Sequence, residues 1–340
     1  MYLASVLSHL DAWELIRTSF SNEFQDIMSA ISQAKPQKRL VDAPKRESNP
    51  FIYRCLELKN SIVEQFIYLN WISNCQDINE LYISRERRSN VDLIKNGIGI
   101  EITFSKFSYA ESATFVKFPL FIKAERFQIG LIILASKSMH ESLPVGSSSF
   151  EMVRDRFVGL GPLNLKFPFA LLGITDIPVE TKVEELTSNL DLFLIKKIGM
   201  SLLEMKWVKE RPQFDFKQEL PENDKLAKEV CAMANNEKGG LILVGIADNG
   251  DMVGLPRDLL DDTQLRITNI IRANCTPIPK FEIKSFDADD IAGSCILIVD
   301  IYEMERKPCM FRDKVYIRAG ASAEPAKPDD IRRLLLGGVG

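Results

Sequence analysis

Histidine is scarce in this chain, with only His9 and His140 among 340 residues. The six cysteines are scattered, and no two of them form a Cys-x-x-Cys pair. Protein zinc sites are usually assembled from such pairs together with histidines, so the sequence gives no support for a zinc site. We therefore expect the cysteines to be reduced thiols buried in the core.

Long apolar runs are also lacking, because none approaches the roughly 20 residues that a membrane-spanning helix needs. The first residues lack the basic start of a signal peptide and reach Asp11 and Glu14 early. We expect a protein that stays in the cytosol and does not bind a membrane.

An excess of positive charge is missing too. The net charge is −4 and the isoelectric point is near 5.5. These values argue against a surface that is basic everywhere, although a local basic cleft for nucleic acid remains possible. A phosphate-binding GxxxxGK[ST] loop is absent as well, so the residues do not favour ATP binding.

Two acids are present where strands are expected. Glu101 is the one charged residue in the apolar run GIGIEITF, and Asp92 lies nine residues earlier in NVDLI. A carboxylate inside a strand is costly unless it is paired, hydrogen-bonded or bound to a metal. Two such acids on adjacent strands can share a divalent cation, although both could instead be solubilising acids at strand ends.

The surroundings of these acids indicate a mixed sheet with helices on its faces. Residues 4–34 have the periodicity of two helices, and helices are also expected over 51–72, 105–127 and 147–161. In the segment 105–127 we expect one side to face inward (Phe115, Phe118, Phe121 and Ile122) and the other outward (Lys117, Lys123 and Arg126). Continuous apolar runs at 129–137 and 167–174 predict buried strands. Three arginines lie close together just before Asp92: Arg85, Arg87 and Arg88. They form either a solvent-exposed face or a phosphate-binding cluster.

This order of acids, helix and strands resembles the BglII/BamHI-like type II restriction endonucleases of the PD-(D/E)XK fold, over roughly residues 5–180. The resemblance implies that Asp92, Glu101 and the backbone carbonyl of Ile102 hold Mg²⁺ or Mn²⁺. The fold usually has a lysine two residues after the second acid, where this chain has Thr103. Lys106 is out of register with Glu101, so it would point to the opposite face of a regular strand. Weak or lost activity therefore remains open.

The second half is organised around WVKERPQFDFKQEL and the glycine-rich stretch that follows a helix at about 224–235. Asp215-Phe216-Lys217 alternates as a strand does, which places Asp215 and Lys217 on one side. Gly239-Gly240 precedes the buried strand LILVGI, and Asp248 follows that strand in a turn.

These motifs resemble the Schlafen AlbA-like domain over about residues 203–338. The resemblance implies a metal held by Glu210, Asp215 and Asp248, with Lys217 as a cation beside the scissile phosphate. Asp215 departs from the glutamate usual in that family. We also expect Arg312, Lys314 and Arg318, near the last strand, to face phosphate, unless they belong to a surface strand of alternating charge.

We predict an α/β (α+β) protein with a restriction-endonuclease-like domain at 1–180, a helical connector at 181–202 and a Schlafen AlbA-like domain at 203–340. The predicted function is a Mg²⁺- or Mn²⁺-dependent endonuclease, acting on DNA or RNA in prokaryotic anti-phage defence. We expect a homodimer, with another defence subunit as a possible partner. Two alternatives stay open: a non-catalytic nucleic-acid-binding subunit, and a ribonuclease in which only the C-terminal domain cuts.

Overall fold

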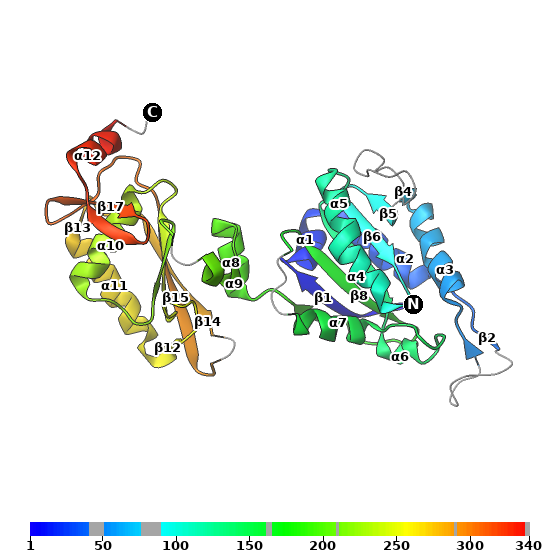
Figure 1. Cartoon of the computed structure of the whole chain (residues 1–340). Coiled ribbons are helices and arrows are strands. Elements are labelled where there is room, and N and C mark those ends of the chain that lie inside the picture. The colour runs from blue at the N-terminus through cyan, green and yellow to red at the C-terminus, as the bar shows by residue number, and fades with distance from the viewer. Residues whose placement is uncertain (41–50, 76–89, 161–164, 209–210, 289–290, 337–340) are drawn as a thin grey trace. The chain divides into compact units, whose positions relative to one another are not determined.

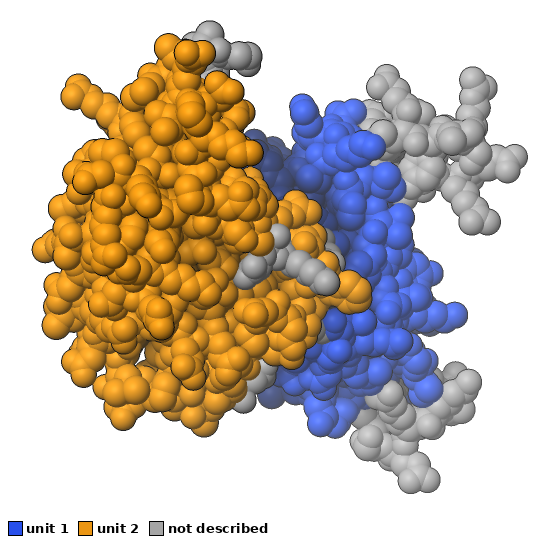
Figure 2. All heavy atoms as spheres, turned by 60° about the vertical axis from the view of Figure 1, so that its left-hand side comes forward, with its two compact units in different colours: residues 1–188 blue, residues 189–340 orange. Residues whose placement is uncertain are grey.

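The computed structural model describes residues 1–40, 51–75, 90–160, 165–208, 211–288 and 291–336 (Figure 1). The chain divides into two compact units, Met1–Ser188 and Asn189–Gly340, which Figure 2 colours blue and orange. Within the described residues, no helix combines the length and apolar character needed to cross a membrane.

The first unit is built on a seven-stranded mixed sheet with the order β4-β5-β6-β7-β8-β1-β9. The strands β6, β7 and β8 run parallel to one another, whereas β5 is antiparallel to β6 and β1 is antiparallel to β8. The strands are β1 (Tyr2–His9), β4 (Ile72–Cys75), β5 (Val91–Lys95), β6 (Ile98–Ile102), β7 (Ile129–Ala135), β8 (Phe169–Thr175) and β9 (Lys182–Glu185), and a separate hairpin pairs β2 (Arg39–Leu40) with β3 (Phe51–Ile52).

Helices cover both faces of this sheet, and each face has its own apolar core (Figure 1). One core is covered by α1 (Ala12–Ser19), α2 (Ser21–Gln33), α3 (Cys55–Tyr68) and the short α6 (Lys137–His140). The other is covered by α4 (Phe107–Ser112), the π-helix η1 (Ala113–Lys117), α5 (Phe118–Lys123) and α7 (Phe150–Gly159). The predicted mixed sheet with helices on its faces is confirmed.

Two local predictions for this unit were wrong. The beginning of the expected N-terminal helix is strand β1, because pairing with β8 and β9 places its apolar side chains in the sheet. The long helical segment expected after Glu101 is present as the consecutive elements α4, η1 and α5, with Pro119 at the start of α5, but its inward-facing side was predicted wrongly at two positions. Phe115, expected inside, is 39% exposed, whereas Lys117, expected outside, is half-buried, with 16% of its side chain exposed.

Glycine at position 99 allows an aromatic ring to lie directly on β6. A Cβ atom at Gly99 would come within 2.4 Å of the Phe127 ring, far closer than two carbons can approach. Gly130 on β7 has the same relationship with Phe118, at 2.3 Å. The apolar layer on the Glu101 side of the sheet therefore depends on glycine in two adjacent strands.

The second unit contains two sheets. The larger has the order β10-β11-β15-β12, with β14 also paired to β15, and the smaller has the order β13-β16-β17-β18. The strands are β10 (Phe214–Lys217), β11 (Gly240–Val244), β12 (Leu255–Pro256), β13 (Cys275–Thr276), β14 (Phe281–Asp287), β15 (Ser294–Ile301), β16 (Met310–Phe311), β17 (Lys314–Ala319) and β18 (Ser322–Pro325). The helices are α8 (Asn189–Ile198), α9 (Leu202–Val208), α10 (Asn223–Asn235), the 3₁₀ turn η2 (Arg257–Leu259), α11 (Leu260–Asn274) and α12 (Pro328–Leu335).

Helix α10 occupies the centre of the second unit. Together with α11 it packs on one face of the larger sheet, and it also contacts the smaller sheet at β17. The opposite face of the larger sheet is covered by α8 and α9. The stretch 181–202, predicted as a connector, contains β9 of the first sheet and α8 of the second unit.

Candidate active site

Asp92 and Glu101 lie on neighbouring strands of the first unit. The pairing of β5 with β6 sets Leu93 opposite Ile100, and the same register carried one residue further sets Asp92 opposite Glu101. The backbone N–H of Ile102 donates to Oδ2 of Asp92 at 2.7 Å. The Asp92 carboxylate is thus fixed against the end of β6 that carries Glu101.

Each acid is paired with a lysine from a helix on the sheet. Nζ of Lys59, on α3, lies 2.6 Å from Oδ1 of Asp92, and Nζ of Lys117, at the end of η1, lies 2.7 Å from Oε1 of Glu101. The acid side chains are only 11% and 6% exposed. Neither acid is therefore a solubilising residue at a strand end.

The second oxygen of Glu101, Oε2, is buried and receives no hydrogen bond from the described part of the chain. Burial, and next the negative charge of Asp92, raise the pKa of Glu101, and the two lysines only partly offset this. A buried, under-coordinated carboxylate oxygen beside a second carboxylate matches the oxygen ligands that Mg²⁺ and Mn²⁺ prefer. The residues present therefore fit a divalent metal.

The positions after Glu101 differ in accessibility. Thr103 is buried, and its backbone N–H donates to the carbonyl of Ile133 on β7 at 3.0 Å. It lies two residues beyond Glu101 and one residue after the end of β6, so a continuation of the strand would direct both side chains to the same face. Lys106 is exposed and immediately precedes α4. The direction of the Ile102 carbonyl as a metal ligand stays a prediction.

Sequence reasoning missed both lysines of this site, Lys59 and Lys117. For Lys117 the sequence does contain an indication of its position, because Lys117 follows Ala113 by four residues and precedes Phe121 by four, and both of these are buried. Residues four apart share a helix face, so this spacing places Lys117 on the buried side. The prediction instead placed Phe115 inward, and two residues correspond to about 200° around a helix, so Phe115 and Lys117 lie on opposite sides.

Four predicted site residues lie outside the described residues: Arg85, Arg87, Arg88 and Glu210.

In the second unit, Asp215 and Lys217 point to the same side of β10, as predicted. Nζ of Lys217 lies 2.6 Å from Oδ1 of Asp215, whose side chain is 1% exposed. Nη1 of Arg318, on β17, lies 3.9 Å from the other oxygen of Asp215 and 2.5 Å from Oε2 of Glu229 on α10. These four residues form a buried charge cluster of two acids and two bases.

Arg318 was expected to face a phosphate, but its side chain is fully buried between Glu229 and Asp215. Glu229 was not predicted, although it lies three residues after Leu226 and four before Met233, on the buried side of α10. Burial, and next the charge of Asp215, raise the pKa of Glu229.

The other predicted residues of this unit are at the surface. Asp248 is exposed in the turn after β11, where Gly250 donates its N–H to the carbonyl of Ala247 at 2.7 Å. Nη1 of Arg312 lies 2.8 Å from Oδ2 of Asp224, and Lys314 is exposed at the start of β17. No contact among the described residues brings Asp248 to Asp215, so a shared metal at these two acids stays a prediction.

Comparisons with known proteins match the two halves of the chain to two families, in the same order as the resemblances in the sequence. Residues 4–174 match the family model for restriction endonuclease BglII/BglIII, and residues 210–327 match the model for Schlafen, AlbA_2. Both resemblances noted in the sequence are thereby confirmed. A search of curated proteins found no match.

Two solved structures are similar to parts of the chain. Restriction endonuclease BglII complexed with a DNA 16-mer is 16% identical, with a TM-score of 0.43, over 51% of this chain and 77% of that one. The DIP2311 protein from Corynebacterium diphtheriae is 23% identical, with a TM-score of 0.29, over 43% of this chain and 29% of that one.

Proposed function

Because the chain belongs to the restriction endonuclease BglII/BglIII family, we propose that its first unit hydrolyses phosphodiester bonds of DNA with Mg²⁺ or Mn²⁺ bound at Asp92 and Glu101. The observation that carries this proposal is the convergence of the two acids at the end of β6, with Oε2 of Glu101 buried and under-coordinated. The carbonyl of Ile102 is the third proposed ligand.

Each side chain of the site has a separate task in the proposed reaction. A divalent metal bound here supplies a water of lowered pKa and neutralises charge on the phosphate. Thr103, on the face of Glu101, hydrogen-bonds and orients the attacking water. The water oxygen forms a bond to phosphorus while one ester P–O bond breaks, which leaves a phosphate monoester and a hydroxyl group.

Lys117 supplies the positive charge that position 103 lacks. Its ammonium group reaches Glu101 from a helix instead of from the strand. In that position it keeps Glu101 ionised for metal binding and offsets the negative charge that develops on the phosphate. Lys59 performs the first of these tasks for Asp92.

For the second unit we propose a role in binding nucleic acid. The match to the Schlafen, AlbA_2 model supports a nucleic-acid-directed role. Asp215 lies beside two cations, Lys217 and Arg318. In the described part of the chain, each acid of the proposed metal site in the first unit forms one ion pair, and this difference supports a structural task for Asp215 rather than metal binding. A ribonuclease centred on Asp248, and a subunit that binds without cutting, are the competing proposals.

Cleavage assays separate these proposals. The full chain is incubated with plasmid DNA and with tRNA, each with Mg²⁺, Mn²⁺ or EDTA. DNA cleavage that requires metal and is lost in Asp92→Asn and Glu101→Gln supports the first proposal. RNA cleavage lost only in Asp248→Ala supports the ribonuclease, and no cleavage with either metal favours the binding subunit.

Asp26→Asn is the matched control for these variants. Oδ2 of Asp26 lies 2.7 Å from Nζ of Lys95, which is on the same strand as Asp92. The variant therefore removes a comparable, partly buried ion pair from β5 without touching the proposed site. The Asp26→Asn variant should still cleave DNA. If it does not, the loss of cleavage in Asp92→Asn would be explained by impaired folding.

We further propose that the protein acts as a homodimer in the restriction of foreign DNA. One metal site of this kind cuts one strand, so cutting both strands of a duplex in a single encounter requires a second copy. Light scattering of the chain with and without a duplex tests this part of the proposal, and a monomer that cuts both strands in one encounter would contradict it.

A further inference from the structure

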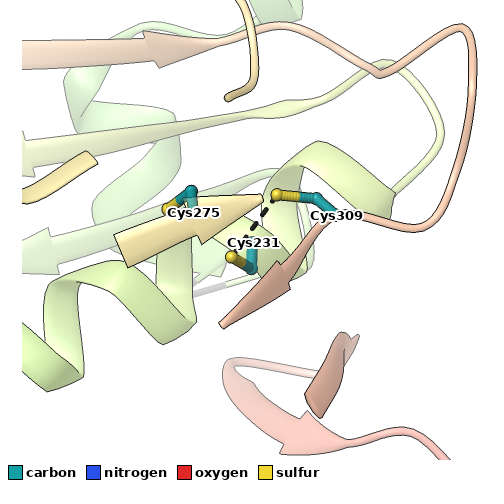
Figure 3. Close-up of side chains that lie close together, drawn as sticks. All are labelled: Cys231, Cys275 and Cys309. Atoms are coloured by element: carbon teal, nitrogen blue, oxygen red, sulfur yellow. Dashed lines mark hydrogen bonds between the residues drawn. The ribbon is translucent and has the colours of Figure 1, made fainter. Parts of the chain in front are cut away.

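Three cysteines that lie far apart in the sequence meet inside the second unit (Figure 3). Cys231 comes from the middle of α10, Cys275 from the start of β13, and Cys309 from the segment just before β16. Their sulfur atoms all lie within 4.8 Å of one another, and those of Cys231 and Cys309 are 3.4 Å apart. All three residues are buried, and none forms a disulfide.

These distances are close to those that a metal would impose. A cation bound about 2.3 Å from each of three sulfurs holds them roughly 3.8–4.0 Å apart. Small rotations of the cysteine side chains would bring the observed arrangement to that geometry. Buried cysteines often serve merely as small apolar residues, but such packing does not require three of them in mutual contact.

The chemistry of the cluster selects a soft metal. Among the described residues, no other histidine, cysteine or acid joins these three in a group of ligand atoms so close together. Three thiolates without carboxylate or imidazole prefer Cu⁺ or Zn²⁺ over Mg²⁺ or Ca²⁺. The carbonyl of Pro277 lies 3.4 Å from the sulfur of Cys309 and is the nearest backbone oxygen described for the cluster.

The surroundings suit a bound cation that clamps several elements together. Asn235, four residues after Cys231 on α10, donates from its side chain to the Cys309 carbonyl at 2.8 Å and accepts from the Cys309 N–H at 2.6 Å. The segment that carries Cys309 is therefore already held in register with the helix. Nζ of Lys228, three residues before Cys231 on α10, lies 5.7 Å from the centre of the ring of Phe311, which is two residues after Cys309.

We propose that Cys231, Cys275 and Cys309 form a structural site for one thiophilic metal ion, Zn²⁺ or Cu⁺, in the second unit. No zinc signature is visible in the sequence, because the three ligands come from separate elements rather than from a Cys-x-x-Cys turn. The bound ion would join α10, β13 and the segment before β16 in the core that also positions Glu229 and Arg318.

Metal analysis of the purified full chain tests the proposal. The chain is unfolded with reductant and refolded with Zn²⁺ or Cu⁺ in separate arms, then dialysed, and one bound ion per chain is expected in at least one arm. Cys231→Ser, Cys275→Ser and Cys309→Ser should each lose that ion. Retention of a full equivalent by any of the three, or no binding in either arm, would overturn the proposal.

Two controls define where the ion is bound. Cys295→Ser removes another buried thiol of the same unit, one outside the cluster, and should keep a full equivalent. The double variant Asp92→Asn/Glu101→Gln should keep it too, which separates this site from the proposed catalytic metal. Loss of the ion in the double variant would place it in the first unit and overturn the proposal.

A spectroscopic measurement on the wild-type chain tests the proposal even when the cysteine variants do not fold. Refolding with Co²⁺ should give thiolate-to-metal charge-transfer absorption with the intensity of three thiolate ligands. An intensity of one thiolate or none would overturn the proposal, as would a Cys231–Cys309 disulfide in protein isolated from cells.

Discussion

Nζ of Lys117 lies 2.7 Å from Oε1 of Glu101, although the two residues belong to different elements and are separated by the whole of α4. The fold thus pairs a strand acid with a helix cation at the point where a metal would bind. This arrangement allows a β6 strand without its own lysine to retain a positively charged group beside Glu101.

In the proposed mechanism Lys117 offsets negative charge on the reacting phosphate. Lys117→Met, which removes that charge and keeps the approximate length of the side chain, should therefore reduce DNA cleavage on the order of 10²-fold. The measurement is kcat/KM with Mg²⁺ on a short duplex. Lys123→Met is the control, since Lys123 is exposed six residues further along the same helical segment, and it should retain wild-type activity. Equal losses in both variants would contradict the assigned role of Lys117.

The raised pKa of Glu101 predicts how stability depends on pH when no metal is present. Between about pH 4.3, the ordinary glutamate pKa, and the raised folded-state pKa, the folded chain binds more protons than the unfolded chain. The contribution of Glu101 to the free energy of unfolding therefore falls as pH rises through that window. Denaturant titrations in EDTA should show this fall, and Glu101→Gln should reduce it.

Metal binding should follow the opposite trend. Only ionised Glu101 can hold a divalent cation, so the affinity for Mg²⁺ or Mn²⁺ should increase with pH, with a midpoint above the ordinary glutamate pKa of about 4.3. Isothermal titration calorimetry with Mn²⁺ at a series of pH values measures the midpoint. A midpoint at or below the ordinary value would argue against Glu101 as a ligand.

Arg318→Met should destabilise the second unit by about 3–5 kcal/mol, because it leaves Glu229 and Asp215 buried without their shared cation. Urea unfolding monitored by circular dichroism gives the value. Arg312→Met removes an exposed arginine paired with Asp224, so it should change stability by less than about 1 kcal/mol. Similar values for the two variants would show that burial of Arg318 does not govern its contribution.

Gly99→Ala should cost about 1–3 kcal/mol, because the new methyl group collides with the Phe127 ring. The companion change Phe127→Leu should recover part of that loss in the double variant. Gly159→Ala adds a methyl group into open space at the end of α7 and should not destabilise the chain. Thermal unfolding of the four proteins provides the comparison.

The strand-and-helix order around Asp92 and Glu101 could be predicted because both strands are apolar runs interrupted by one acid. Strand β1 could not, because its pattern of Leu3, Val6 and Leu7 suits a helix equally well and only pairing with β8 decides the outcome. Asp92 and Glu101 were found from the cost of placing a carboxylate in a strand. Their lysine partners could not be found that way, because Lys59 and Lys117 lie on helices and reach the acids only through packing. The spacing of Lys117 from Ala113 and Phe121 indicates the buried side of its helix but does not identify Glu101 as its partner.

The second unit shows a different limit of prediction. The alternation in β10 was enough to place Asp215 beside Lys217. The burial of Arg318 depends on Glu229 and Asp215, which reach it from α10 and β10, and neither contact has a local signal. The proximity of Cys231, Cys275 and Cys309 could not be predicted either, because it results from the way α10 packs on the smaller sheet.

The π-helical turn η1 ends at Lys117, so the number of residues between β6 and Lys117 decides whether the ammonium group reaches Glu101. Each residue of an α-helix rotates the following side chains by about 100°. Removing or adding a single residue between Phe107 and Lys117 would therefore swing the ammonium group away from Glu101, even with every side chain of the site intact. Chains that share both acids but differ there in length would need to recruit their positive charge from elsewhere.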